Sequence, residues 1–234
     1  MKQTFIILTI FFLGCSGRQN SGQDKTVKSD TIKIESKSVG FDSIINRACL
    51  HQDLSYNYDY KIKSERLVNF NGINDSCTVQ VIVFDKKTHL KIDSLGLTSI
   101  YYYGDVFQDC NNVRSYITGK NETQRSMDND YGEFIIVDIN FDSKEDLAII
   151  NDSGGNGGTF YSFYVQDNNK KFHLDKFLTD SMVYFPSKIN KKNKTIVTYV
   201  HAGVGGLGEH IYAYNDKTKL WKEISHKYID ITKE

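Results

Sequence analysis

Short runs of alternating apolar and polar residues, many of them aromatic, constrain the fold of this 234-residue chain more than any other feature. Alternation with a period of two places apolar side chains on one face of a β-strand. Polar turn residues separate the runs, and the sequence contains a single proline. We therefore predict an all-β fold, a mostly antiparallel sandwich or barrel-like sheet with at most one or two short helices. The runs that indicate strands are residues 77–85, 132–139, 146–151, 160–166, 194–201 and 210–215.

One segment departs from this alternation. Residues 41–50, with the sequence FDSIINRACL, are typical of a short helix, and Asp42 would cap its N-terminus. Elsewhere, polar hairpin turns connect the predicted strands, and each ends in an apolar residue that opens the next strand. These turns start at Asp85, Asp167 and Asn215.

The second half of the chain contains a weak internal repeat. When the turn at Asp167 is aligned with the turn at Asn215, Gly157–Gly158 aligns with Gly205–Gly206. Each copy then consists of a strand, a glycine-rich loop, a strand, a turn and a strand. Two copies are too few for a propeller, and we expect them to form two faces or two halves of the fold.

The first 39 residues are expected to be targeting and tether sequence. Lys2 precedes an apolar run at 5–13 that is too short to span a bilayer as a helix. Gly14–Cys15 follows as in a bacterial lipobox, so residues 1–14 would be a signal peptide and Cys15 would be lipidated. The alternative is an ordinary secretory signal with an incidental cysteine. Residues 15–39 are polar and would form a disordered tether to a single β-rich domain at 40–234. The predicted location is the bacterial cell envelope, lipid-anchored and either periplasmic or surface-exposed.

Charge and cysteine content narrow the partners and the compartment. Lys plus Arg and Asp plus Glu balance at 29 each, so no nucleic-acid partner is expected. With Cys15 assigned to lipid, an exported chain has three cysteines left for one disulfide. Cys77 and Cys110 both lie among strand-like segments, so we predict that pair and leave the state of Cys49 open.

Oxygen-bearing side chains recur at alternate positions from Asp138. Hard cations such as Ca²⁺ bind six to eight oxygens, which a short loop supplies from alternate residues. The ligands would be Asp138, Asn140, Asp142, the backbone carbonyl of Lys144, and Asp146. This spacing predicts a calcium site. The alternative is an acidic β-turn whose side chains cap backbone amides.

The loop resembles the FG-GAP or VCBS type of calcium loop, which lies between β-strands. The match covers Asp138, Asn140, Asp142, Asp146 and Leu147. In that family a glycine occupies the position of Ser143. Relative to an EF-hand loop, Ile149 also replaces the bidentate glutamate, so we expect weak calcium binding.

Two glycine-rich segments, DSGGNGG at 152–158 and HAGVGGLGEH at 201–210, lack the helix that a phosphate-binding or dinucleotide-binding loop requires. We interpret them as places where the backbone turns sharply or a partner approaches closely. His201, Glu209 and His210 are either metal ligands or polar residues that line these loops. No catalytic residues are predicted, because the sequence has no nucleophile elbow. A hydrolase with a carboxylate pair stays open.

The stretch from Cys77 to Trp221 resembles periplasmic lipoproteins related to I-type lysozyme inhibitors, some of which are immunity proteins against secreted peptidoglycan-cutting effectors. The resemblance implies a β-rich fold whose loops enter a muramidase cleft. Lysozyme inhibitors often present an S-G-x-x-Y loop, but here Gly157 stands where that tyrosine would be. The partner-binding residues implied are Ser153, Gly154, Asn156, Tyr161, His201 and Glu209.

The predicted function is therefore that of a membrane-tethered periplasmic binding protein, not an enzyme, that inhibits or gives immunity to a muramidase. Its partner would be a lysozyme-like glycoside hydrolase or a secreted antibacterial effector. The alternative is a calcium-stabilised surface lipoprotein that binds a glycan or another protein.

Overall fold

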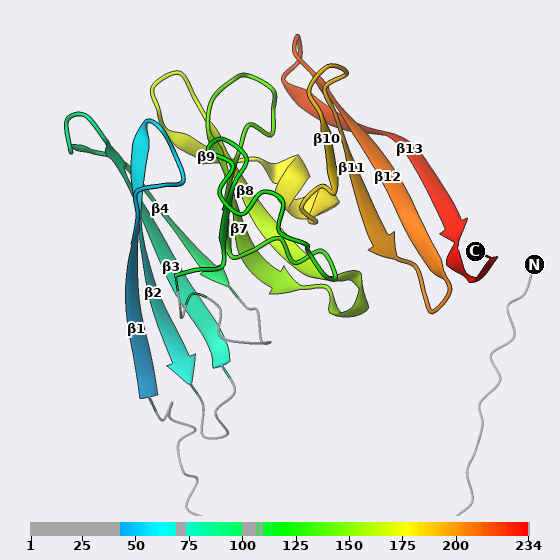
Figure 1. Cartoon of the computed structure of the whole chain (residues 1–234), viewed down its shortest axis with the longest axis horizontal. Coiled ribbons are helices and arrows are strands. Elements are labelled where there is room, and N and C mark those ends of the chain that lie inside the picture. The colour runs from blue at the N-terminus through cyan, green and yellow to red at the C-terminus, as the bar shows by residue number, and fades with distance from the viewer. Residues whose placement is uncertain (1–42, 69–73, 100–106, 108–109, 234) are drawn as a thin grey trace, which may run out of the picture. The chain divides into compact units, whose positions relative to one another are not determined.

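The computed structural model describes residues 43–68, 74–99, 107 and 110–233 (Figure 1). The predicted signal peptide, the lipidated Cys15 and the tether to residue 39 lie outside these residues. The described part of the chain forms thirteen strands. In chain order they are β1 (Ser43–His51), β2 (Tyr58–Val68), β3 (Asn74–Asp85), β4 (Lys91–Ser99), β5 (Val113–Ser115), β6 (Phe134–Val137), β7 (Asp146–Ser153), β8 (Thr159–Gln166), β9 (Phe172–Leu174), β10 (Lys188–Asn190), β11 (Thr195–His201), β12 (Gly206–Asn215) and β13 (Leu220–Asp230).

These strands assemble into three open sheets, which confirms the predicted all-β class. The first and third sheets, β1–β4 and β10–β13, are antiparallel meanders in chain order. In the second sheet, β5–β9, only β5 and β6 pair in parallel. Helical structure in the described residues is limited to η1 (Gly155–Gly157), the turn at residues 176–182 that contains the π-helical η2 (Leu178–Met182), and η3 (Ile231–Lys233). None of these helices has the length and apolar character that crossing a membrane would require.

The second sheet supplies the centre of the core. Every residue of β6 is buried, as are the apolar residues 147–150 of β7. Such continuous apolar runs, without polar alternation, are typical of strands covered on both faces. One apolar cluster joins this sheet to Tyr60 and Val81 of the first sheet and to Tyr212 and Trp221 of the third. In Figure 1 the second sheet accordingly lies between the other two.

Polar side chains form the three predicted hairpin turns. Asp85 Oδ1 accepts hydrogen bonds from the backbone N–H groups of residues 87 and 88, both at 3.0 Å. Asp167 Oδ1 and Asn215 Oδ1 each accept two further backbone N–H groups of their own turns. A left-handed residue, with φ between 57° and 62°, follows in each turn at His89, Lys170 and Lys219. The turns therefore form as the sequence predicts.

The internal repeat is also visible in the structure. Strands β7, β8 and β9 are connected like β11, β12 and β13, and each first hairpin carries one of the glycine-rich loops. The same hydrogen bond closes both loops, from Gly154 N to Gly158 O at 2.6 Å and from Ala202 N to Gly206 O at 2.9 Å. The two copies belong to different sheets.

The helix predicted for residues 41–50 is wrong. Residues from Ser43 form β1, which pairs with β2 along its whole length. Burial alternates at the end of the strand, where Cys49 and His51 are buried and Leu50 is exposed. The long alternating partner strand β2 determines the structure here, because backbone pairing outweighs a weak local helical pattern. The proposed cap, Asp42, lies outside the described residues.

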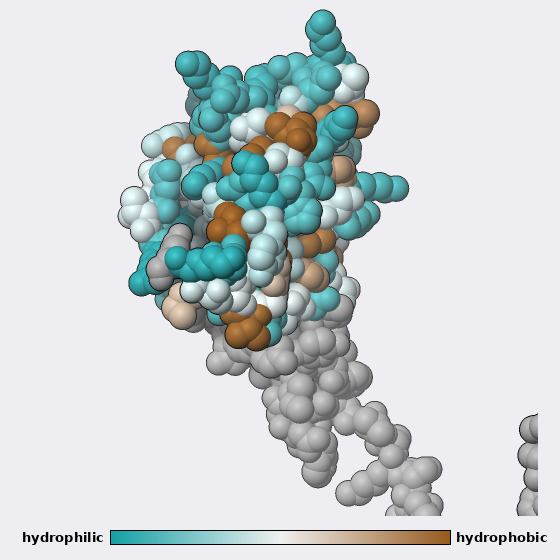
Figure 2. Space-filling view, turned by 90° about the vertical axis from the view of Figure 1, so that its right-hand side faces the viewer, coloured by the Kyte–Doolittle hydropathy of each residue, from teal (hydrophilic) through white to brown (hydrophobic). Residues whose placement is uncertain are grey.

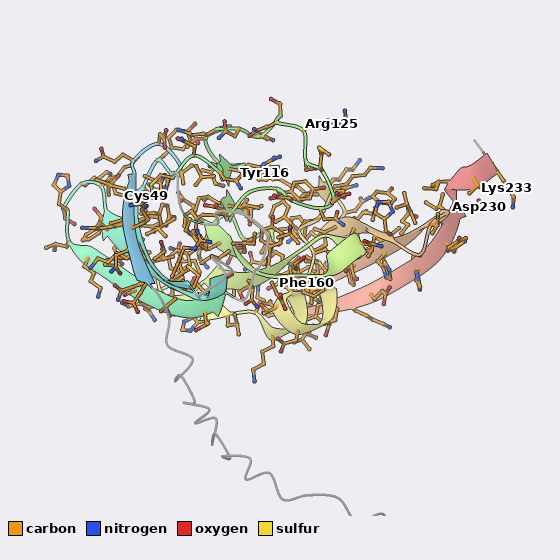
Figure 3. All side chains as sticks on the ribbon, turned by 90° about the horizontal axis from the view of Figure 1, so that it is seen from below. Cys49, Tyr116, Arg125, Phe160, Asp230 and Lys233 are labelled. Atoms are coloured by element: carbon orange, nitrogen blue, oxygen red, sulfur yellow. A yellow bond between two sulfur atoms is a disulfide. The ribbon has the colours of Figure 1, made fainter. Side chains whose placement is uncertain are left out.

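The predicted disulfide also needs correction, because Cys49 pairs with Cys110 (Figure 3 labels Cys49 on β1). The Cα atoms of these two residues are 5.6 Å apart. Cys77 is a free thiol on β3, where its side chain packs in the apolar core. Burial raises the pKa of Cys77 to about 11, which keeps the thiol protonated and unreactive.

Candidate functional site

The two glycine-rich loops lie side by side, although they belong to different sheets. Asn129 joins them, because its side-chain amide donates to Gly157 O at 2.8 Å and to Tyr199 O at 2.9 Å. A side-chain carbon added at Gly157 would lie 3.5 Å from Val200 of β11. The loops, with the segment that carries Asn129, therefore form one surface.

This surface contains two shallow hollows lined by both polar and apolar groups. The first, of about 360 Å³, is lined by Asp128, Gly155, Asn156, His201, Gly203 and Val204. The second, of about 410 Å³, shares Asp128, Gly155 and Asn156 and extends to Ser153 and Met127. We call the joint surface the loop surface. It brings together three of the predicted partner-binding residues, namely Ser153, Asn156 and His201, and Gly154 lies within the same loop.

The absence of a side chain at Gly158 lets the first glycine-rich loop pack closely against the backbone of Asp128. Its φ of 100° is a left-handed conformation that strains other residues, and an added Cβ would collide with the backbone oxygen of Asp128. Gly154 is restricted in a different way, because a Cβ there would collide with the ring of Phe160. These glycines are therefore needed for packing of the loop rather than for contact with a phosphate.

Two predicted partner-binding residues do not belong to the loop surface. Tyr161 is fully buried, and its hydroxyl donates to Gly132 O at 3.1 Å and accepts from Tyr131 N at 2.9 Å. It supports the neighbouring segment from within and cannot contact a partner. Glu209 lies further along β12, where its carboxylate accepts from the hydroxyl of Tyr199 at 2.8 Å.

Sequence reasoning missed the segment at 127–130, which supplies Met127, Asp128 and Asn129 to the loop surface. Its only local signal is the polar run DND before Tyr131 and Gly132. That run indicates a loop, but it does not indicate which other loops lie beside it.

The acidic loop at 138–146 connects β6 to β7, between strands as predicted. Its side chains accept backbone N–H groups. Asp138 Oδ1 and Asn140 Oδ1 share the N–H of Asp142, at 3.0 and 3.1 Å, and Asp138 Oδ2 accepts from Ser143 N at 3.2 Å. Ser143 has a φ of 67°, so it takes the left-handed conformation for which the related calcium loops use glycine.

Asp146 is the most buried member of this loop. Its Oδ2 accepts from Ile139 N at 3.0 Å and from Asn140 N at 3.4 Å, and its Oδ1 accepts from Gln166 N of β8 at 2.9 Å. Burial raises the pKa of Asp146 to about 8 despite these three N–H donors, and the nearby charge of Asp142 contributes to this increase. A bound cation would favour the ionised form of both carboxylates.

The residues present fit a hard cation in chemical type, because all the predicted ligand atoms are oxygens. Asp138 and Asn140 already converge on one N–H group. The Lys144 ammonium, however, lies 2.8 Å from Asp142 Oδ2 and neutralises the charge that a cation would neutralise. Among the described residues, the three aspartates of the loop are not within 4.8 Å of one another. A cation would therefore have to displace the lysine.

The acidic loop also connects the three sheets. Next to Asp146, Glu145 accepts from Ser55 at 2.7 Å and from Tyr60 at 3.0 Å, both near or in the first sheet. Phe141 packs on Trp221 of the third sheet, with ring centroids 6.0 Å apart. Since β7 has eight residues, the acidic loop lies roughly 23 Å from the loop surface. A cation bound there could not stiffen a glycine-rich loop directly.

Comparisons with known proteins show a likeness of fold. No protein-family model matches the chain, and no curated protein matches it. A solved structure described as a Xanthomonas type IV secretion system related protein is similar, with a TM-score of 0.50 and 16% sequence identity. The match covers 82% of this chain and 85% of that one. At this identity the shared feature is the arrangement of the strands.

Proposed function

We propose that this protein is a bacterial envelope protein, tethered by a lipid on Cys15, that binds and blocks a peptidoglycan-cutting muramidase. It acts by binding and not by turnover. The observation that carries the proposal is the loop surface, where two repeat-related loops and a third segment are packed into one surface before any partner arrives. Preorganisation of this kind lowers the ordering cost of binding.

The chemistry of the loop surface suits a protein partner. Met127 and Val204 are strongly exposed apolar side chains that line the two hollows, and methionine is enriched in protein interfaces. Asn156 and His201 offer hydrogen-bond donors toward the carboxylates that glycoside hydrolases use. On the face shown in Figure 2, apolar residues are scattered among polar ones, so a purely apolar interface is not favoured there.

Two observations support a location in the cell envelope. The N-terminal sequence resembles a lipoprotein signal, and the similar fold belongs to a protein described as related to a type IV secretion system. A protein tethered in the envelope would lie where enzymes cut peptidoglycan. Loss of the protein from the membrane fraction in Cys15→Ser would support the anchor, and unchanged association would contradict it.

We also propose that Ca²⁺ binds the acidic loop, held by Asp138, Asn140, Asp142, the carbonyl of Lys144, and Asp146. When bound, the cation supplies positive charge that neutralises the clustered carboxylates. Because Glu145 and Phe141 connect this loop to the other sheets, its role would be to stabilise the fold and not to contact the muramidase.

A wall-lysis assay tests the proposed inhibition. Turbidity of a peptidoglycan suspension is followed with a panel of lysozymes and with any effector encoded beside the gene. We expect the wild-type chain to block at least one enzyme at micromolar concentration. Asn156→Trp should fill the hollows and abolish the block. Asn168→Trp, in the exposed turn at the far end of β8, is the matched control and should block normally.

Three outcomes would contradict the proposal. Equal inhibition by both tryptophan variants would show that the loop surface is not the contact. Binding to a sugar array without inhibition of any enzyme would favour the glycan-binding alternative. Turnover of labelled peptidoglycan by the chain itself would show a hydrolase.

A further inference from the structure

A β-bulge in the third sheet places three potential metal ligands on one face. His210 of β12 and His226 of β13 lie directly opposite each other. The register shifts after Ile211, so Tyr212 pairs with Glu223 and Ile224 becomes the extra residue. Residues three positions apart on a regular strand point to opposite faces, but a bulge redirects one of them. Glu223 and His226 therefore share a face.

The three side chains are already in contact. His210 Nδ1 lies 2.7 Å from Glu223 Oε1, and the rings of His210 and His226 stack with centroids 4.1 Å apart. One ligand atom from each residue lies within 4.8 Å of the other two. In the part of the chain that the structure describes, no other three His, Cys, Asp or Glu side chains meet this distance.

The absence of a side chain at Gly208 leaves space for the two imidazole rings. It precedes His210 on the same face of β12, and a Cβ at this glycine would lie 3.0 Å from His210 Nε2 and 3.6 Å from His226 Nε2. The site is open to solvent, since the Glu223 side chain is 43% exposed and His226 is exposed. Water can therefore complete the coordination of a bound ion.

Two imidazoles and one carboxylate are ligands of Zn²⁺ rather than of Ca²⁺ or Mg²⁺, which prefer oxygen alone. A neutral imidazole binds metal through the nitrogen that carries no proton. If His210 keeps its proton on Nε2, the lone pair of Nδ1 faces the position now taken by the hydrogen bond to Glu223. An ion bound by Nδ1 and Oε1 would replace their hydrogen bond, and the two atoms would move apart, because zinc lies about 2.0–2.2 Å from each such ligand. A ring nitrogen of His226 would be the third ligand.

We propose that His210, Glu223 and His226 form a Zn²⁺ site that fastens β12 to β13, with at least one coordination position left to water. The site is separate from the acidic loop, and the two differ in metal preference because their donor atoms differ. It does not depend on the proposed inhibition of a muramidase.

Isothermal titration of the metal-stripped full chain, purified without a histidine tag, tests the site. We expect one Zn²⁺ per chain, with little heat from Mg²⁺. His226→Ala and Glu223→Gln should each weaken Zn²⁺ binding by about tenfold or more, because each removes one ligand.

His173→Ala is the matched control. The Nε2 atom of His173, an exposed residue of β9, lies 3.0 Å from Asp167 Oδ2, and this histidine–carboxylate pair has no third ligand among the described residues. Its loss should leave Zn²⁺ binding unchanged. Thermal unfolding in chelator establishes that each variant is folded, and the visible spectrum of bound Co²⁺ separates nitrogen and oxygen ligands from cysteine thiolates. Absence of Zn²⁺ binding by the wild type, or binding that survives both site variants, would overturn the proposal.

Discussion

At the scale of single residues, side-chain oxygens that accept backbone N–H groups determine the shape of most loops. Asp85, Asp167 and Asn215 do so in the three hairpin turns, and Asp138 does so in the acidic loop. Such contacts are local in sequence, so the turns could be predicted from the residue types alone. The burial of Tyr161 could not, because it depends on which segment covers β8.

Substitution of Ser143 tests whether the left-handed backbone conformation in the acidic loop is strained. Its φ of 67° costs a residue with a side chain about 1–2 kcal/mol, whereas glycine adopts it freely but loses more entropy on folding. We expect Ser143→Gly to stabilise the fold by about 0.5–1 kcal/mol in urea unfolding. The control is Ser94→Gly within β4, where glycine should destabilise by a similar amount. Destabilisation by both would show that Ser143 is not strained.

His51 should make stability depend on pH. Its ring is buried and stacks on Phe134, and its Nε2 has no hydrogen-bond partner among the described residues. Burial lowers the pKa of His51 in the folded state, although Asp53 opposes this effect. The unfolded chain then binds the proton more readily, so this stability is present above about pH 6.5 and is lost as pH falls through the folded pKa.

Urea midpoints at about pH 8 and about pH 5.5 measure this dependence. In His51→Phe the decline in stability toward the lower pH should be smaller than in the wild type. An equal decline in both proteins would assign the pH dependence to other groups.

At the scale of elements, alternation in the sequence predicts strands well and predicts their partners poorly. All six predicted strand segments are strands, including β3, β7 and β12. The pattern at residues 41–50 favours a helix on its own, and pairing with β2 makes residues 43–51 a strand. The bulge between β12 and β13 also had no local signal, although it brings Glu223 beside His210 and His226. The register between two strands depends on the side chains of both strands, so the sequence of one strand alone does not determine it.

Calcium should stabilise the fold by binding the acidic loop that joins β6 to β7. At about 10 mM Ca²⁺ a site with a dissociation constant of about 10⁻⁴–10⁻³ M would stabilise the fold by about 1–3 kcal/mol. We expect calorimetry to show a higher melting temperature with Ca²⁺ and a smaller effect with Mg²⁺. Asp142→Ala should remove most of the calcium effect. Asp216→Ala, in an exposed turn paired with Lys194, should retain it.

No thermal shift and no heat with millimolar Ca²⁺ would show that the acidic loop is only a turn capped by its own side chains. The observed hydrogen bonds are compatible with both interpretations, since N–H groups and a cation can share the same carboxylates. The Asp142–Lys144 ion pair favours weak binding, because the cation has to compete with an ammonium already in place.

At the scale of the whole molecule, the contacts between sheets decide which distant residues form a site. The loop surface needs segments from near residues 128, 156 and 201, and their meeting depends on how the second and third sheets pack. The internal repeat predicted that the two glycine-rich loops would be equivalent, and it allowed their adjacency. It carried no information on the third segment, which is outside the repeat. The distance between the calcium-type loop and the loop surface follows from the length of β7, because the strand predicted for residues 146–151 already separates the two loops along the chain.

Removal of the Cys49–Cys110 disulfide tests how much the connection between the first and second sheets stabilises the fold. It joins β1 to the segment that leads into β5, across a sequence separation of 61 residues. Closing a loop of this length restricts the unfolded chain, and removal of such a bond typically costs about 2–4 kcal/mol. We expect Cys110→Ser to lose about this much in urea unfolding. Cys77→Ala is the control for cysteine loss and should cost less, because it deletes only a small buried side chain.

Alkylation distinguishes the Cys49–Cys110 disulfide from the Cys77–Cys110 disulfide that the sequence predicts. In the folded, non-reduced chain the Cys77 thiol should not react, since it is buried and its pKa is raised to about 11. After unfolding without reductant, Cys77 should be labelled, and peptide mapping should recover residues 49 and 110 in one linked fragment. Label on Cys49 instead would mean that Cys77 and Cys110 are paired. The first sheet would then be tied to the second through β3, a strand whose Cys77 side chain now fills the core.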